Sequence, residues 1–198
     1  MIQKYTPQRI ITSLFGTDGT RKYLTTPEIR RFLFHAAKRN EEQRLLCLVL
    51  AFTGCRLSEA LRMTSTSIDE EAQALTFQTL KQRRQNVFRQ VPVPKFLITA
   101  LQIHLASAGR ERVWLVHRQT ARRWIAAIMK DADLSGFRAN SRGLRHGFAV
   151  GCVEEDVPIT VLKKWLGHAR LETTAIYTNV VGAEELALAE RRWMSIEC

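Results

Sequence analysis

The sequence lacks the marks of a secreted, metal-bound or membrane-embedded chain. Its four cysteines, Cys47, Cys55, Cys152 and Cys198, form no C-x-x-C pair and have no histidines at metal-finger intervals. That spacing favours neither a zinc site nor a disulfide framework. The most apolar run, residues 45–52, is far shorter than the roughly 20 residues of a membrane-spanning helix, and the N-terminus has no signal-like apolar core. We therefore expect a soluble protein of the reducing cytoplasm.

Acidic residues are scarce, and one long stretch has none. Lysine and arginine number 30 against 19 acidic residues, which gives a formal charge of +11 and a pI near 10.1. No acidic residue lies between Glu71 and Glu111, a stretch that holds Lys81, Arg83, Arg84, Arg89, Lys95 and Arg110. Clustered positive charge indicates a polyanion-binding face, so nucleic acid is the first partner to test. A charge that serves only solubility is the alternative.

Repeats, low-complexity tracts and Pro/Gly-rich linkers are also absent. With 45% apolar residues among 198, the chain is long enough for one sizeable core. Residues 1–23 show little periodicity and are interpreted as an irregular leader or arm. Thr25, Pro27 and Glu28 then give a helix-start signal. The ordered domain is therefore predicted over residues 24–198.

Periodicity predicts a mainly α domain with a small antiparallel β-sheet. Helices are expected over 45–52, from near Leu57, and over 96–106, 120–132, 144–154, 159–166, 173–177 and 183–194. The runs 74–80 and 87–94 are strand-like and flank the basic segment 81–86, which predicts a β-hairpin with a cationic tip. Residues 64–68 and 113–116 are further candidate strands. This is an α+β pattern in one domain.

Three segments resemble the motifs of tyrosine recombinases, the phage-integrase type. They are 53–61 (TGCRLSEAL), 143–149 (GLRHGFA) and 166–168 (LGH), the last followed by Tyr177 nine residues after its histidine. Their order and spacing are similar to those of the family's catalytic domain, over about residues 24–194. The size resembles that of fimbrial-switch recombinases, and the larger N-terminal DNA-clamping domain common in the family is missing from this sequence.

Breaking a phosphodiester without a metal requires a nucleophile, cations for the developing negative charge and an acid for the departing oxygen. The resemblance implies that Arg56 and Arg145 hold the non-bridging oxygens, for which the bidentate guanidinium is well suited. It also implies that Lys81 protonates the leaving 5′-oxygen, that His168 hydrogen-bonds the phosphate, and that Tyr177 attacks to form a 3′-phosphotyrosine.

One position departs from the family pattern. Arg142 stands where the second motif usually has the histidine thought to act as general base, and arginine cannot accept a proton. As a charge, Arg142 would lower the pKa of Tyr177 or bind phosphate. His146 is expected to face away from the side of the helix that carries Arg142 and Arg145, so it is given no role.

Other residues have supporting predictions. Glu59 matches an acidic position that would pair with and orient a cation, with a plain surface carboxylate as the alternative. Arg83, Arg84 and Arg89 are expected to bind DNA, and Lys81 itself belongs to that basic loop. The predicted helix 183–194 would dock on a neighbouring subunit or cover its own core.

Together these features predict a site-specific recombinase of a mobile element or plasmid. It would act on double-stranded DNA as a tetramer, in the cytoplasm at the nucleoid, without metal or ATP, with a possible accessory DNA-binding protein. Without a clamping domain, binding by a monomer is expected to be weak and salt-sensitive. The alternatives are a type IB topoisomerase and a catalytically silent DNA-binding regulator, the latter motivated by Arg142.

Overall fold

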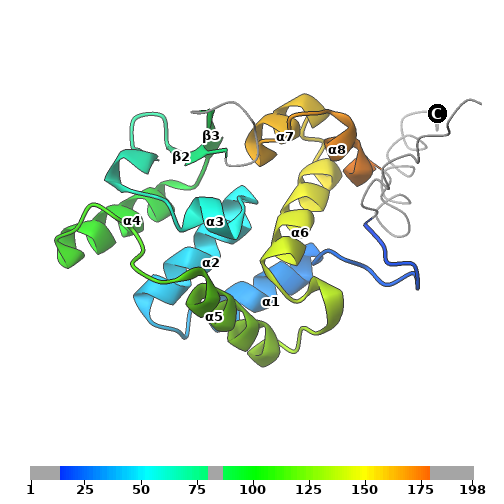
Figure 1. The fold of residues 1–198 in the computed structure, drawn as a ribbon, viewed down its shortest axis with the longest axis horizontal. Helices are drawn as coiled ribbons and strands as arrows, with labels where there is room; N and C mark the ends of the chain where they lie inside the picture. Colours follow the sequence, from blue (N-terminus) through cyan, green and yellow to red (C-terminus); the bar gives the residue numbers. More distant parts are fainter. Residues whose placement is uncertain (1–13, 80–86, 179–198) are drawn as a thin grey trace, which may run out of the picture.

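The computed structural model describes residues 14–79 and 87–178. Helices dominate these ranges, with one small sheet at the side of the molecule, as the sequence predicted (Figure 1). The α-helices are α1 (Thr26–Ala36), α2 (Glu41–Thr53), α3 (Leu57–Ala60), α4 (Lys95–Ala108), α5 (Arg118–Asp131), α6 (Ser141–Glu154), α7 (Ile159–Leu166) and α8 (Glu172–Ala175). Short 3-10 turns are η1 (Ser65–Ser67), η2 (Gly136–Arg138) and η3 (Ile176–Thr178). No helix in the described ranges is long and apolar enough to cross a membrane.

The sheet is antiparallel in the order β1 (Ile68–Asp69), β2 (Ala74–Gln78), β3 (Phe88–Pro92). The β2–β3 pair confirms the predicted hairpin strands, while the hairpin tip lies outside the described residues. The prediction of a strand over 113–116 was wrong, and most of 64–68 forms the turn η1 rather than a strand. Val113 and Trp114 are buried, at 0% and 1% exposure. Their apolar side chains produced a sequence pattern like that of a strand, although the segment pairs with no strand in the described ranges.

Helix starts follow their capping residues. The Thr25 side chain accepts from the Glu28 backbone N–H, and the Glu28 carboxylate accepts from the Thr25 backbone N–H at 2.8 Å, which forms the capping box the sequence indicated. Asn140 caps α6 through its side chain, because its Oδ1 accepts from the backbone N–H groups of Arg142 and Gly143. The start of α6, which carries the second motif, is thereby well defined.

Two apolar clusters hold the fold. The larger joins α1, α2, α4 and α5 with the inner face of the sheet, and in it the Trp114 indole N–H donates to the Ala60 carbonyl at 2.7 Å. The smaller joins α6 and α7 to the segment that ends the described chain, and includes Val150, Leu162 and Tyr177. Burial of each such large side chain contributes about 1.5–3 kcal/mol.

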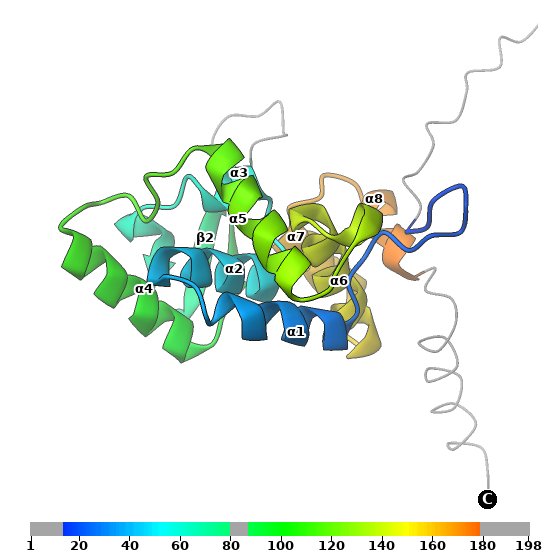
Figure 2. The same cartoon turned by 90° about the horizontal axis from the view of Figure 1, so that it is seen from below.

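Residues 14–23, interpreted from sequence as part of an irregular leader, have a packing role. Leu14 and Tyr23 are each only 2% exposed and belong to the same small cluster as Tyr177. Both views place this first described segment beside α8 (Figures 1 and 2). The segment therefore helps to position the element that carries the predicted nucleophile.

Candidate active site

Arg56 lies at the break between two helices. Gly54 ends α2 in the left-handed conformation at φ 58°, which favours glycine, and Arg56 occupies the N-cap position of α3. The Arg56 backbone N–H and one guanidinium nitrogen donate to the two oxygens of Glu59, at 2.9 Å and 2.8 Å. The Arg56 side chain remains 24% exposed, so part of its guanidinium is open to a ligand.

Glu59 is a buried ion-pair centre rather than a surface carboxylate, and the prediction that it pairs with a cation is confirmed. Its side chain is fully buried and also accepts from Arg89 at 2.6 Å. Burial alone would raise the pKa of Glu59, but the charges and hydrogen bonds of Arg89 and Arg56 outweigh it and lower that pKa. Glu59 is therefore an anion shared between two arginines.

The prediction that Arg89 lies on a DNA-binding surface was wrong. Arg89 is 6% exposed, and besides Glu59 it donates to the Trp165 carbonyl at 2.7 Å and the Thr79 hydroxyl at 3.2 Å. Along β3 alternate residues are buried, and Arg89 falls on an inward position. Each of its three guanidinium nitrogens has a protein partner, so Arg89 ties the sheet to α3 and α7.

Arg145 projects from α6 onto the ends of two other helices. Its guanidinium donates to the Gly54 carbonyl at 2.7 Å and to the Leu166 carbonyl at 2.8 Å. Helix C-termini carry partial negative charge, which attracts the guanidinium without neutralising it. Burial, and next the positive charge of Arg56, lower the pKa of Arg145 to about 10, so it remains a cation at neutral pH.

His168 follows α7 through a glycine turn. Gly167 is left-handed at φ 65°, and the His168 N–H donates back to the Lys163 carbonyl. Arginine has no acceptor, so His168 Nε2 accepts from Arg145 at 2.9 Å, and Nδ1 donates to the Thr174 hydroxyl at 2.9 Å. Burial first, then Arg145, lower the pKa of His168 to about 3. His168 is therefore neutral.

Tyr177 lies in the turn η3 against both histidines of the site. Its ring stacks on His168 with centroids 6.4 Å apart and an interplanar angle of 8°. Its hydroxyl is 2.9 Å from Nδ1 of His146, and the residue is 1% exposed. Burial raises the pKa of Tyr177, while the charges of Arg145 and Arg56 partly oppose that rise.

The prediction that His146 faces away from the site was wrong. Residues four apart on a helix lie on the same face, so Arg142 and His146 share one face of α6. The i, i+4 spacing from Arg142 to His146 was the signal in the sequence, and the prediction assigned His146 to the wrong face of the helix. Burial first, then the charges of Arg145 and Arg142, lower the pKa of His146 to about 4. Arg142 itself is exposed in the first turn of α6.

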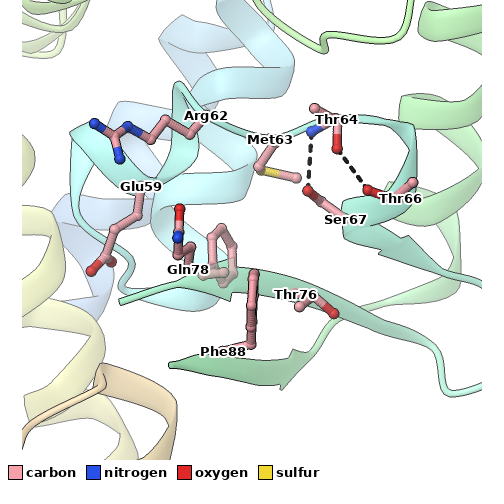
Figure 3. A pocket seen from close by; sticks show the side chains of 10 residues that line it. Glu59, Arg62, Met63, Thr64, Thr66, Ser67, Thr76, Gln78 and Phe88 are labelled. Carbon is pink, nitrogen blue, oxygen red and sulfur yellow. Dashed lines mark hydrogen bonds between the residues drawn. The ribbon is translucent and has the colours of Figure 1, made fainter. Parts of the chain in front are cut away.

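A groove that the sequence did not indicate adjoins Glu59. It is lined by Glu59, Arg62, Met63, Thr64, Thr66, Ser67, Thr76, Phe77, Gln78 and Phe88. Figure 3 shows Arg62 near Glu59 at one end, the hydroxyls after α3 at the other, and β2 and β3 as the floor. Phe88 is 60% exposed. Hydroxyls, an amide and an arginine offer donors suited to a sugar-phosphate backbone.

Several predicted residues are not placed. Lys81, Arg83 and Arg84 lie outside the described residues, as does the predicted helix 183–194. Among the described residues, the structure brings Arg56, Arg145, His168 and Tyr177 into one connected site, and Arg142 acts on it through its charge, which helps to lower the pKa of His146.

Two arginine cations and a neutral histidine around a tyrosine hydroxyl define a class of site that suits attack of a phenol on a phosphate group. Comparison with known proteins identifies the family of the chain. The model of the phage integrase family matches residues 22–184, and the chain belongs to that family. Tyrosine recombinase XerA from Thermococcus onnurineus is 29% identical over 185 residues, covering 89% of this chain and 64% of XerA.

Solved structures show the same fold. The catalytic domain of bacteriophage HP1 integrase has a TM-score of 0.63 at 24% identity, covering 89% of this chain and 98% of that one. XerH site-specific recombinase, in a post-cleavage complex with a palindromic difH substrate, has a TM-score of 0.74 at 22% identity, covering 98% of this chain and 60% of that one. The fold is that of a tyrosine recombinase catalytic domain, and the chain spans just under two thirds of the length of the XerA relative.

Proposed function

We propose that this chain is a site-specific DNA recombinase that breaks and rejoins strands through a 3′-phosphotyrosine at Tyr177. The observation that carries the proposal is the connected site itself: Arg56, Arg145, His168 and Tyr177 come from four separate segments of the chain and converge within a member of the phage integrase family. A DNA-binding protein without catalysis has no need of a tyrosine hydroxyl at such a place.

Arg56 and Arg145 supply the charge for the transition state. A guanidinium has five N–H donors, and Arg145 uses three of them, for the carbonyls of Gly54 and Leu166 and for Nε2 of His168. Its remaining donors, with those of Arg56, hold the non-bridging phosphate oxygens. His168 accepts from Arg145 through Nε2 and so orients it in the resting state; its hydrogen bond to the phosphate requires the tautomer with the proton on Nε2, in which Nδ1 accepts from the Thr174 hydroxyl. Lys81 remains the proposed general acid, as the family resemblance implies.

Attack requires the sheltered Tyr177 hydroxyl to become accessible to DNA. At 1% exposure the hydroxyl cannot reach a phosphorus atom in a DNA strand. The groups that cover the hydroxyl must therefore move aside when DNA binds, so the described arrangement is the resting state of the site. Such gating protects against cleavage before the DNA site is complete.

Double-stranded DNA is the proposed partner. The charge of +11, the groove beside Glu59 and the basic residues Arg83 and Arg84 support backbone binding. Among the structural neighbours, XerH is bound to a difH substrate and the Tn1549 transposon integrase is in complex with transposon right end DNA. We further propose strand exchange in a tetramer at the nucleoid, with an accessory protein that compensates for weak binding by the monomer. Arg62 and Phe88 would line the path of the strand next to the scissile phosphate.

Covalent trapping tests the function. The protein and its Tyr177→Phe variant are incubated with nicked duplexes drawn from the DNA that flanks its gene, and a denaturation-resistant protein–DNA adduct is sought. Tyr23→Phe is the matched control, because Tyr23 is buried in the same cluster. We expect an adduct in the wild type and in Tyr23→Phe and none in Tyr177→Phe.

Binding to the same duplexes without any adduct would favour the catalytically silent regulator, the reading that Arg142 motivates. An adduct formed equally well on duplexes of unrelated sequence would favour a type IB topoisomerase. Both outcomes are read from a denaturing gel for the adduct and a parallel native mobility-shift gel, which shows that the DNA was bound.

A further inference from the structure

The hydrogen bond between His146 and Tyr177 has no place in the roles assigned so far. The Nδ1 atom of His146 lies 2.9 Å from the Tyr177 hydroxyl, with ring centroids 5.7 Å apart at 50°. The hydroxyl of Tyr177 is the atom that would bond to phosphorus. His146 therefore touches the reacting group directly, from the helix that also carries Arg145.

The residue at position 142 explains why the contact between His146 and Tyr177 matters for the chemistry. The family resemblance places a proton-accepting histidine there, but this chain has Arg142, which has no lone pair to offer. His146 lies one helical turn further along the same face of α6. The structure thus offers an imidazole on the expected face, displaced by one turn, in contact with the nucleophile.

We propose that His146 is the proton acceptor for Tyr177, an inference that rests on the strand-cleavage function proposed above. The hydroxyl donates to Nδ1 while the ring proton of His146 resides on Nε2. As the phenolic oxygen forms its bond to phosphorus, the phenol proton passes to Nδ1 and the bond from phosphorus to the 5′-oxygen breaks. That oxygen leaves with a proton from the general acid. Rejoining reverses each transfer, so His146 returns the proton to the phenol.

The surroundings of His146 keep it neutral before DNA binds. The charged groups that act on it are Arg145 and Arg142 on its own helix and Lys22 on the leading segment, while Tyr177 contacts it and neutral His168 lies near it. These cations and burial lower its pKa. A DNA phosphate brings negative charge to the same cations and thereby favours the imidazolium that proton transfer creates. The acceptor is strengthened when substrate is present.

A purely structural tether for Tyr177 predicts different behaviour, and His146→Asn separates the two. The asparagine side-chain oxygen can occupy roughly the place of Nδ1 and accept the hydroxyl hydrogen bond, but it cannot hold a proton. General-base catalysis contributes typically about 10²- to 10⁴-fold. We expect His146→Asn to bind DNA like the wild type and to form adduct about 10²-fold or more slowly. His117→Asn is the control, because His117 is an exposed N-cap that asparagine can replace.

A second measurement isolates the proton. In a Tyr5→Phe, Tyr23→Phe background, Tyr177 is the last tyrosine, so growth on 3-fluorotyrosine places a more acidic phenol at that position alone. We expect fluorination to restore much of the adduct rate of His146→Asn and to change the wild type little. The pH dependence of the rate should also change, because His146→Asn removes the acidic limb.

The outcomes are distinct. If His146→Asn forms adduct at the wild-type rate, or if fluorination leaves its rate unchanged, the role of proton acceptor is overturned while the recombinase proposal stands. If the wild type itself forms no adduct, the proposed function fails first and His146 is a structural partner of Tyr177.

Discussion

Glu59 is the residue whose replacement should most disturb the structure beneath the site. Its carboxylate is fully buried and contacts Arg89 at 2.6 Å and Arg56 at 2.8 Å. We predict that Glu59→Gln, which keeps the shape and removes the charge, destabilises the fold by about 3–5 kcal/mol, as is usual when one partner of a buried pair is lost. Against a total of about 5–15 kcal/mol, that is a large fraction.

Most of this cost should come from Arg89. Its side chain is 4% exposed, so its charge would be left in the interior without a counter-ion, whereas Arg56 is 24% exposed and water can solvate it. Replacing both Glu59 and Arg89 should then lower the free energy of unfolding by less than the sum of the two single replacements. In Glu59→Gln with Arg89→Met no unpaired charge remains buried, and we expect recovery of at least about 1 kcal/mol relative to Glu59→Gln alone.

Urea unfolding followed by tryptophan fluorescence gives the four free energies of this cycle. Glu41→Gln is the control, because Glu41 pairs with Arg44 at 3.8 Å with both side chains well exposed, and it should change stability by less than about 1 kcal/mol. The reasoning is refuted if Glu59→Gln is as mild as Glu41→Gln, or if the losses in the double variant simply add.

Three further outcomes are expected. In the folded chain the pKa values of His146 and His168 are about 4 and about 3, below the ordinary 6.5. As the pH drops from 7 toward 4, the unfolded chain therefore takes up protons before the folded chain does, and the melting temperature should fall. The fall should be shallower in His146→Asn. Gly143→Ala would bring its Cβ to 1.8 Å from a backbone carbonyl oxygen and should lower the melting temperature, costing at least about 1–3 kcal/mol, whereas Gly151→Ala, with its nearest neighbour at 3.6 Å, should be neutral or stabilising. Arg145→Ala should slow adduct formation by about 10²- to 10³-fold at unchanged protein concentration, and an adduct rate within a few-fold of wild type would remove Arg145 from the proposed chemistry.

The fold was largely predictable because its local signals agree with its packing. The cap at Thr25 starts α1, the glycine at position 54 ends α2, and the predicted helix 159–166 coincides with α7. The strand predicted over 113–116 failed for a different reason. An apolar run marks burial, and burial without a neighbouring ladder of hydrogen bonds gives an extended segment rather than a strand.

The site was predictable where the motif carried the information and not where tertiary contacts did. Arg56, Arg145, His168 and Tyr177 were identified by order and spacing, and all four lie together. On β3, by contrast, an arginine points inward and Phe88 outward, at 6% and 60% exposure, the reverse of the usual preference. The buried anion Glu59 comes from another element, and periodicity within the strand cannot reveal it.

The charges of the site match the reaction proposed for it. Arg89 and Arg56 share the single anion Glu59, whereas Arg145 is held by the carbonyls of Gly54 and Leu166. Carbonyl dipoles position a guanidinium without neutralising it. With its histidines neutral, the site keeps an excess of two positive charges from three arginines and one carboxylate. A phosphodiester carries one negative charge, and more charge gathers on its non-bridging oxygens in the transition state, so the excess favours the transition state over the bound ground state. A second anion near Arg145 would remove that preference, which is a physical reason for holding this arginine with backbone carbonyls instead of a carboxylate.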